Sequence, residues 1–186
     1  MLNETTVTKL HEMKTPIMAQ SFKEQLQNPA FSSMPFEERF GLIVDSEWGT
    51  RKSNKLIRLI KNAGYEFGNA AVEDIDYRAD RKLDRAQITA LATCNYIIEH
   101  HNIVILGATG NGKTYLSNAF GVAANRNFYP VKYIRLPDLL AELAIARQEH
   151  TYPKVVKQYK QACLLILDEW VLFPLKEAEA RDVLTS

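Results

Sequence analysis

The spacing of apolar residues changes along this chain and predicts two kinds of structure. In the first third, apolar residues recur at helical intervals among charged ones, as do Phe36, Phe40, Ile43, Val44 and Trp48. Such a stripe is typical of amphipathic helices. We predict helices over 8–13, 16–26, 36–48 and 53–63, and therefore a small all-α N-terminal domain over residues 1–67.

Residues 68–85 have a different composition. They are rich in charged side chains and sparsely apolar, which is typical of a linker between domains. Ile75 and Tyr77 could still pack on the edge of a core, and the segment could help to line an adenine pocket. A solvated linker and a packed segment both fit this pattern.

The remainder of the chain alternates helical patterns with short apolar runs. A helical stripe predicts a helix from Asp84 to about His100. The runs 102–106, 131–135 and 164–167 are rich in aliphatic residues, as buried parallel strands are. Strands that alternate with helices predict an α/β domain with a parallel sheet flanked by helices. We assign it to residues 86–186.

A glycine-rich stretch follows the first of these runs and leads into a helical pattern. It consists of Gly107, Ala108, Thr109, Gly110, Asn111, Gly112, Lys113 and Thr114, with Tyr115 next. It matches the phosphate-loop pattern G-x-x-x-x-G-K-[ST] between a strand and a helix. Glycines let the backbone curl around an anion, and N–H groups at the helix start point at phosphate oxygens. An ordinary glycine turn is the alternative, but four specified positions seldom coincide by chance.

The loop predicts a P-loop NTPase fold that binds ATP with Mg²⁺. Lys113 is expected to reach the β- and γ-phosphates, and the Thr114 hydroxyl is expected to ligate Mg²⁺.

Two carboxylates follow the last apolar run, at the strand end where open α/β sheets bind ligands. Asp168 is predicted to hold Mg²⁺ through the water shell of the ion, beside Thr114, and Glu169 to orient the attacking water as the catalytic residue. A strand that ends in a charged turn would look the same, but the position 54 residues after Thr114 favours the paired interpretation. An Asp-Glu pair favours hydrolysis, and the strand order implies an AAA+-type sheet by analogy.

A basic cluster lies in the predicted helical domain. It consists of Arg51, Lys52, Lys55, Arg58 and Lys61, and no acidic residue interrupts it. Such a cluster could contact the phosphate backbone of double-stranded DNA, or it could be an ordinary solvated helix face.

Composition adds little to this picture. The net charge is +1, so the whole chain shows no preference for an acidic partner. Cys94 and Cys163 lack a metal-binding spacing and are expected to be buried free thiols in a reducing cytoplasm. The start of the chain is not a secretory signal, and no apolar run approaches the ~20 residues of a membrane span. We therefore expect a cytoplasmic protein without a membrane partner.

From about residue 35 onwards, the chain resembles the IstB family of transposition helper ATPases, which are similar to the DnaC helicase loaders within AAA+. The stretches that carry the resemblance are Phe36–Arg39, 45–47 with Arg51, Gly107–Leu116, Tyr133–Leu140, 146–147 and Leu164–Trp170. The resemblance implies an ATPase that assembles on DNA as an oligomer and passes target DNA to a transposase. A helicase loader and a nucleotide-binding remnant without turnover are the alternatives.

The chain departs from the family pattern in two places. Family members often carry Asp-Asp before Trp-Gly, whereas this chain has Asp168-Glu169-Trp170-Val171; Glu169 still matches the wider AAA+ pattern. The sequence also ends at Ser186 inside an expected helix, so the core is expected to be truncated, without its C-terminal strands. Because neither a sensor residue nor an arginine finger can then be assigned, we expect weak ATP hydrolysis by this polypeptide alone.

Overall fold

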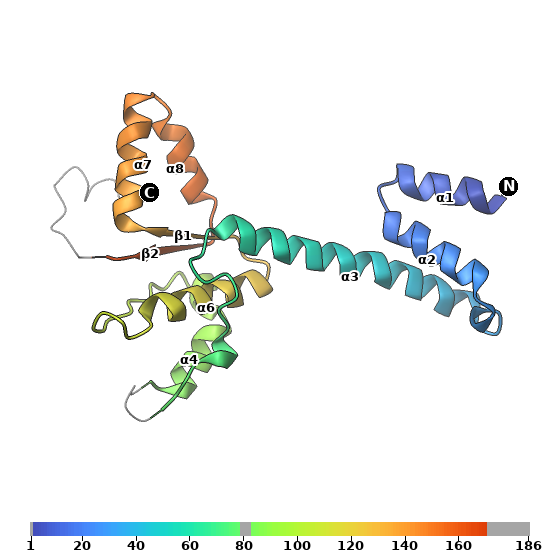
Figure 1. The fold of residues 1–186 in the computed structure, drawn as a ribbon, viewed down its shortest axis with the longest axis horizontal. Helices are drawn as coiled ribbons and strands as arrows, with labels where there is room; N and C mark the ends of the chain where they lie inside the picture. Colours follow the sequence, from blue (N-terminus) through green and yellow to red (C-terminus); the bar gives the residue numbers. More distant parts are fainter. Residues whose placement is uncertain (1, 79–82, 171–186) are drawn as a thin grey trace. The chain divides into compact units, whose positions relative to one another are not determined.

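The computed structural model describes residues 2–78 and 83–170, and it divides into two units (Figure 1). Unit 1 comprises residues 1–55 and unit 2 comprises residues 56–186. The domain boundaries predicted from the sequence, after residues 67 and 85, stay predictions. The predicted helix at the end of the chain lies outside the described residues.

Unit 1 is helical. Helices α1 (Leu2–Glu12) and α2 (Pro16–Gln27) contact each other, and a short 3-10 helix, η1 (Pro29–Phe31), follows. Pro16 occupies the first turn of α2, where its missing N–H costs nothing. The helices predicted over 8–13 and 16–26 are confirmed, although α1 begins earlier than expected.

Helix α3 (Phe36–Ala63) is one continuous helix where the sequence analysis predicted two. The expected break fell around Gly49, a residue that weakens a helix but does not end it. An ion pair between Glu47 and Arg51, one turn apart, spans this point. Because this segment contains no proline, nothing prevents the backbone hydrogen bonds from continuing.

Unit 2 holds the sheet. Strands β1 (Val131–Arg135) and β2 (Leu164–Asp168) pair in parallel, with Val131 opposite Leu164 and Arg135 opposite Asp168. The strands predicted over 131–135 and 164–167 are thus confirmed. The other elements of this unit are η2 (Val72–Asp74), α4 (Arg85–Ala92), α5 (Asn95–Ile98), α6 (Lys113–Arg126), α7 (Leu136–Gln148) and α8 (Tyr152–Lys160).

Helices cover both faces of the two strands (Figure 1). On one face, Tyr133 and Ile166 pack with Ala123 and Ala124 of α6. On the other face, the residues that alternate with these along each strand pack with α7 and α8; they are Ile134, Leu165 and Leu167. The alternation along each strand therefore produces an α/β/α arrangement with α6 directly beneath the sheet.

The strand predicted over 102–106 is wrong: the structure shows no strand there. Ile103 and Ile105 pack on the core, whereas Val104 and Leu106 are 76% and 87% exposed. The segment keeps the alternation of a strand, but within the described residues neither β1 nor β2 pairs with it. Apolar content alone does not make a strand, because the backbone needs a neighbour to bond with.

The segment before this run also differs from its prediction. The helix expected from Asp84 to His100 is divided into α4 and α5, because Cys94 has a left-handed backbone with φ of +64°. Cys94 is buried as expected, but Cys163 is exposed. Cys163 stands in the turn just before β2, where its backbone N–H, and not its thiol, makes the contact with Pro130.

Ile75, in the charged segment 68–85, is buried with Ile88 and Phe120. That part of the segment is therefore packed against α4 and α6 rather than solvated.

Candidate functional site

The glycine loop lies at the start of α6 and is open to solvent. Gly110 and Gly112 have φ of +82° and +78°, a left-handed backbone that glycine adopts without strain. The loop therefore turns directly into α6, whose first N–H groups have no acceptor within the helix. Such a helix start binds anions well.

Lys113 folds back over this loop. Its Nζ donates to the carbonyl oxygens of Gly107 and Ala108, each at 2.9 Å. Carbonyl oxygens are neutral, so these bonds hold the ammonium group in place without cancelling its charge. The lysine is thus positioned over the loop that a phosphate would fill.

The structure brings Thr114 and Asp168 together, although they are 54 residues apart. The Thr114 hydroxyl donates to Asp168 Oδ2 at 2.7 Å. Thr114 is in the first turn of α6, and Asp168 is the last residue of β2. Packing of α6 against the sheet therefore joins the two residues that the sequence analysis predicted as Mg²⁺ ligands.

Tyr133 of β1 contacts the same carboxylate. Its buried phenol donates to Asp168 Oδ2 at 2.9 Å, and the Glu169 backbone N–H donates to Oδ1 at 2.8 Å. Burial pushes the pKa of Asp168 upwards, but the hydrogen bonds from Thr114, Glu169 and Tyr133 outweigh it and lower the pKa. Burial and the bond to Asp168 raise the pKa of Tyr133, so it stays a neutral donor.

Glu169 is held by Arg135, the last residue of β1. The Arg135 Nη2 donates to Glu169 Oε2 at 2.6 Å. Glu169 has φ of +55°, a left-handed conformation that costs a non-glycine residue about 1–2 kcal/mol. The carboxylate predicted to orient water is therefore tied to a cation in this structure.

Two fully buried amides fix α6 to the segment that follows α3. Asn118 Nδ2 donates to the Thr114 carbonyl at 2.8 Å, and its Oδ1 accepts from the Phe67 N–H at 3.0 Å. Asn125 Oδ1 accepts from the Tyr65 hydroxyl at 2.9 Å. A Cβ at Gly121 would lie 2.6 Å from the Tyr65 ring, so this close approach requires glycine.

The sequence analysis missed three residues of this site: Tyr133, Arg135 and Asn118. Tyr133 and Arg135 lie on the same face of β1, which ends at the edge where ligands bind, but their contacts depend on how β1 pairs with β2. Asn118 stands one turn after Thr114, but nothing in the sequence shows that its amide is buried.

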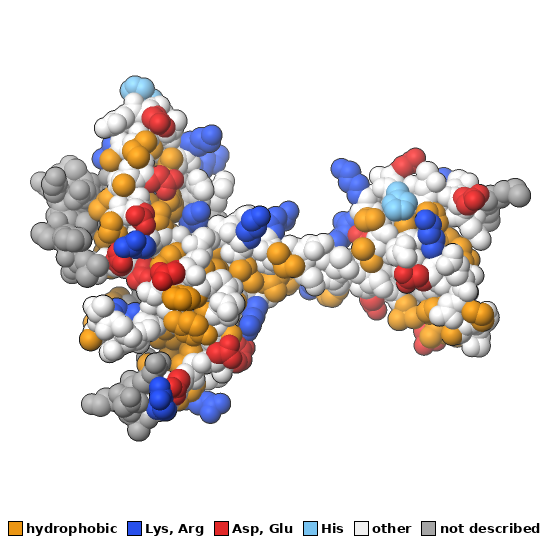
Figure 2. Space-filling model, viewed as in Figure 1, with side chains coloured by type: hydrophobic (Ala, Val, Ile, Leu, Met, Phe, Trp, Pro, Cys, Tyr) orange, Lys and Arg blue, Asp and Glu red, His pale blue; other side chains and the backbone are white. Residues whose placement is uncertain are grey.

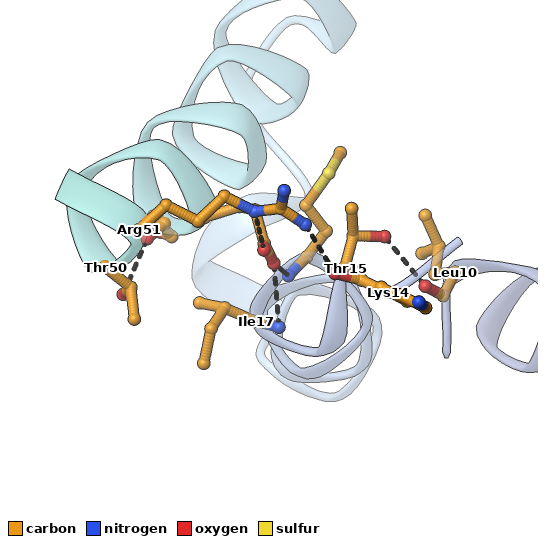
Figure 3. Close-up of polar contacts among 9 residues, drawn as sticks. Leu10, Lys14, Thr15, Ile17, Thr50 and Arg51 are labelled. Atoms are coloured by element: carbon orange, nitrogen blue, oxygen red, sulfur yellow. Dashed lines mark hydrogen bonds and ion pairs between the residues drawn. The ribbon is translucent and has the colours of Figure 1, made fainter. Parts of the chain in front are cut away.

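The five basic residues of α3 do not share one environment. Arg51 is turned towards α2: its Nε donates to Glu47 Oε1 at 2.6 Å and its Nη2 donates to the Lys14 carbonyl (Figure 3). Glu47 Oε2 in turn accepts from the N–H groups of Ile17 and Met18 at 3.0 and 3.1 Å. Arg51 therefore helps to attach α3 to the start of α2.

The other four basic residues are exposed along α3, which also carries exposed apolar side chains (Figure 2). The Lys52 ammonium lies 3.9 Å from the ring centre of Trp48, a cation–π contact. Lys55 is in unit 1, and Arg58 and Lys61 are in unit 2.

Within the described ranges, no three His, Cys, Asp or Glu residues form a group that could hold a metal ion. A P-loop site does not need such a group, because a hydroxyl, a carboxylate, phosphate oxygens and water molecules would together supply the ligands of the ion. Among the described helices, none is long and apolar enough to cross a membrane.

Comparison with known proteins gives a consistent result. Residues 8–186 match the family described as IstB-like ATP binding protein. Over 184 residues the chain is 37% identical to the insertion sequence IS1162 ATP-binding protein of Pseudomonas fluorescens, covering 99% of this chain and 80% of that relative.

Two further relatives carry similar descriptions. The insertion sequence ATP-binding protein y4pL of Sinorhizobium fredii is also 37% identical over 184 residues, covering 99% of this chain and 75% of the relative. The insertion sequence IS21 ATP-binding protein of Pseudomonas aeruginosa is 27% identical, covering 92% of this chain and 64% of the relative. These matches support ATP as the ligand and an association with insertion sequences.

Proposed function

Because this chain belongs to the family of IstB-like ATP-binding proteins, we propose that it is an ATP-dependent helper of insertion-sequence transposition. In this proposal it binds Mg²⁺-ATP at the loop of residues 107–114. It then assembles on double-stranded target DNA as an oligomer and assists the transposase, in the cytoplasm where that DNA lies.

The contact between Thr114 and Asp168 carries the nucleotide part of the proposal. A hydroxyl and a carboxylate 2.7 Å apart are oxygen ligands of the kind that Mg²⁺ prefers, and they lie beside the loop that Lys113 closes. Bound Mg²⁺ would neutralise charge on the β- and γ-phosphates. The described residues fit that role: Thr114 and Asp168 would hold the ion, and the loop N–H groups and Lys113 would hold the phosphates.

Hydrolysis requires Glu169 to orient a water molecule. In the structure its Oε2 is bonded to Arg135, so this oxygen becomes available to water only if Arg135 shares or releases it. In this structure, Arg135 therefore restrains the carboxylate that would act as the general base. ATP binding does not depend on this step, whereas turnover does.

Lys52, Lys55, Arg58 and Lys61 are our candidates for the DNA contact. Their positive charges would displace counterions from phosphates, which is the main source of sequence-independent affinity for DNA. Arg51 was also predicted to contact DNA. Its guanidinium group already bonds Glu47 and the Lys14 carbonyl, so we assign it a structural role.

Replacement of Lys113 tests the nucleotide site. Lys113→Ala removes the charge that faces the phosphates and should weaken Mg²⁺-ATP binding by about 10–100-fold, as expected for a lost hydrogen bond to a charged group. Titration with a fluorescent ATP analogue measures this. Lys154→Ala, which removes an exposed lysine of α8, is the matched control and should bind as the parent does.

Equal affinity of Lys113→Ala and parent would show that ATP does not bind at this loop.

Duplex DNA binding, measured with and without ATP, tests the helper role. The parent should bind DNA more tightly with ATP, and Lys113→Ala should lose the difference. If the DNA affinity of the parent is the same with and without ATP, the helper role is contradicted, whereas the proposed ATP binding is not.

A further inference from the structure

The segment that follows α3 is tied to the first turn of α6, beside Thr114. The residue that joins them is Asn118, whose side chain is fully buried. Its Nδ2 donates to the Thr114 carbonyl at 2.8 Å, and its Oδ1 accepts from the Phe67 N–H at 3.0 Å. One buried amide therefore connects the helix of the phosphate loop to a backbone group 51 residues earlier in the chain.

A second contact between the same two elements lies next to Asn118. The Tyr115 hydroxyl accepts from the Ala71 N–H at 3.3 Å, and the rings of Tyr115 and Phe67 pack with their centres 6.0 Å apart. Between these two contacts, Ala70 is buried and its N–H donates to the Phe67 carbonyl at 3.1 Å. Residues 67–71, which we call the α6 brace, thus contact α6 at both of their ends.

The α6 brace depends on these side chains for its hydrogen bonds. Residues 67–71 belong to no helix or strand of the described structure, so neither kind of element supplies acceptors for their N–H groups. Backbone donors that are shielded from water need an acceptor. Asn118 and Tyr115 provide one each, to the first and the last residue of the brace. The brace and the first turn of α6 are therefore expected to be ordered together.

Thr114 is held at two of its atoms by different parts of unit 2. Its hydroxyl donates to Asp168 of β2 at 2.7 Å, whereas its carbonyl accepts from Asn118 and, at 2.9 Å, from the Ser117 hydroxyl. Threonine is β-branched and has few side-chain conformations, so the position of its backbone largely sets the position of its hydroxyl. A shift of the α6 brace would therefore be transmitted to the oxygen that is proposed to ligate Mg²⁺.

A second buried amide of α6 provides a comparison within the same helix. Asn125 lies about two turns after Asn118, is also fully buried, and also bonds the segment after α3, through the Tyr65 hydroxyl at 2.9 Å. Its Nδ2 donates to the Tyr129 carbonyl at 2.8 Å, beyond the end of α6. Asn118 bonds the first turn of α6, next to the phosphate loop, whereas Asn125 bonds groups at the other end of this helix.

We propose that Asn118 is a positioning residue of the nucleotide site, which fixes Thr114 for Mg²⁺ and links that site to the α6 brace. Linkage is reciprocal: if the brace favours binding of Mg²⁺-ATP, bound Mg²⁺-ATP stabilises the brace by the same factor. The inference rests on the nucleotide site of the proposed function. It deepens that proposal by naming a residue that acts through Thr114 and by extending the site to a segment that precedes the phosphate loop in the chain.

Hydrogen exchange of the whole chain, measured by NMR with and without Mg²⁺-ATP, tests the linkage without any substitution. The Phe67 and Ala71 amide protons should exchange about fivefold or more slowly in the Mg²⁺-ATP complex, since a typical coupling between sites is of that size. Amide protons of α1, which belongs to unit 1, serve as the reference and should exchange at the same rate in both conditions.

Replacement of Asn118 tests the residue itself. Asn118→Ala removes the bonds to Thr114 and Phe67, so Mg²⁺ should half-saturate the ATP complex at a concentration about two- to tenfold higher. The added protection of the brace should disappear, whereas ATP binding without Mg²⁺ should not change. The matched control is Asn125→Ala, which also removes a fully buried amide from α6 but should keep the Mg²⁺ dependence and the protection of the parent. Circular dichroism shows whether each variant is folded.

The parental Mg²⁺ dependence in Asn118→Ala would contradict the proposal. An equal shift in Asn125→Ala would also contradict it, because the effect would then be a general loosening of α6. If the added protection survives in Asn118→Ala, the nucleotide stabilises the brace without this amide, and the role of Asn118 is wrong.

The parent alone separates this inference from the proposed function. If the parent binds Mg²⁺-ATP and the exchange of Phe67 and Ala71 does not slow, the linkage is overturned and the nucleotide site stands. If the parent binds no Mg²⁺-ATP, both are overturned. This measurement decides the linkage even if neither alanine variant folds.

Discussion

At the scale of single residues, Asp168 is the most constrained group of the candidate site. Thr114 and Tyr133 both donate to its Oδ2, and the Glu169 backbone N–H donates to Oδ1. If Asp168 and Thr114 hold Mg²⁺ in this site, Tyr133 would already orient the carboxylate for that role. We therefore infer that Tyr133 positions Asp168 without itself touching the ion.

Tyr133→Phe tests this positioning role. The change keeps the ring in the core but removes the donor, so Mg²⁺ should half-saturate the ATP complex at a concentration about two- to tenfold higher. ATP binding without Mg²⁺ should not change. The control is Tyr65→Phe, which also removes one phenolic hydroxyl, but one that donates to Asn125 and not to Asp168. An identical Mg²⁺ dependence for Tyr133→Phe and parent would contradict the role.

The sequence predicted some of these residues and not others, for a physical reason. Lys113, Thr114 and Asp168 could be predicted because each function needs one residue type at a fixed position next to a strand or helix. Tyr133 and Arg135 could not, since their contacts depend on the register that sets Arg135 opposite Asp168. Register is a property of two strands together and cannot be read from either one.

At the scale of elements, Glu47 explains how α2 is attached to α3. Its carboxylate accepts from the Ile17 and Met18 N–H groups, which are the unpaired donors at the start of α2. The hydrogen bond from Arg51 has the largest influence on the pKa of Glu47. Together with the N–H donors of α2, it lowers this pKa below the ordinary 4.5, although burial acts to raise it. The i, i+4 spacing of Glu47 and Arg51 was visible in the sequence, but their contact with α2 was not.

Glu47→Gln should therefore destabilise unit 1. We expect the free energy of unfolding to fall by about 1–3 kcal/mol at neutral pH, because the hydrogen bonds that Glu47 accepts would lose their charged acceptor. The folded pKa is lowered, so the contribution of Glu47 is complete above the unfolded value of about 4.5 and disappears as pH falls through the folded value. Urea unfolding of parent and variant should then converge in acid.

Glu24→Gln is the control for this change. Glu24 lies on α2 and, like Glu47, accepts a side-chain hydrogen bond, here from Gln20, but that contact is exposed. Its replacement should change stability by less than about 0.5 kcal/mol. A Glu47→Gln variant as stable as parent at neutral pH would show that this carboxylate does not hold α2 in place.

The segment 102–106 shows the limit of prediction at this scale. Its composition matches a buried strand as well as that of β2 does, yet only β1 and β2 pair within the described residues. β2 forms because Val131–Arg135 offers it a ladder of backbone partners. An apolar run therefore predicts burial of alternate residues, which Ile103 and Ile105 show, more reliably than it predicts pairing.

At the scale of the whole molecule, the class of fold was predictable from the pattern of elements. Helical spacing predicted a helical start, and the glycine loop before a helical pattern identified the nucleotide unit, although the strand expected before that loop is not in the structure. Contacts divide the chain after Lys55, inside α3. Because the helical pattern of α3 has no break at this point, the sequence does not reveal the division; the linker predicted over 68–85 stays a prediction.

Because α3 belongs to both units, its basic residues need separate tests. Arg51 bonds Glu47 and the Lys14 carbonyl, and Lys52 contacts the Trp48 ring, so neither reports on DNA alone. Arg58 and Lys61 are exposed, belong to unit 2 and are three residues apart on one helix face. If they contact phosphates, joint replacement by Gln should weaken duplex binding and reduce its salt-dependence slope by about 1.8, or ~0.9 for each lost contact.

Joint replacement of Lys157 and Lys160 by Gln provides the control for that experiment. It removes the same charge from exposed positions on α8, so it corrects for any general effect of net charge on affinity. The double variant on α8 should keep the salt slope of the parent. The proposed contact is contradicted if both double variants change the salt-dependence slope equally, or if neither does. The Arg58 and Lys61 face is then an ordinary solvated surface, and DNA binds another part of the molecule.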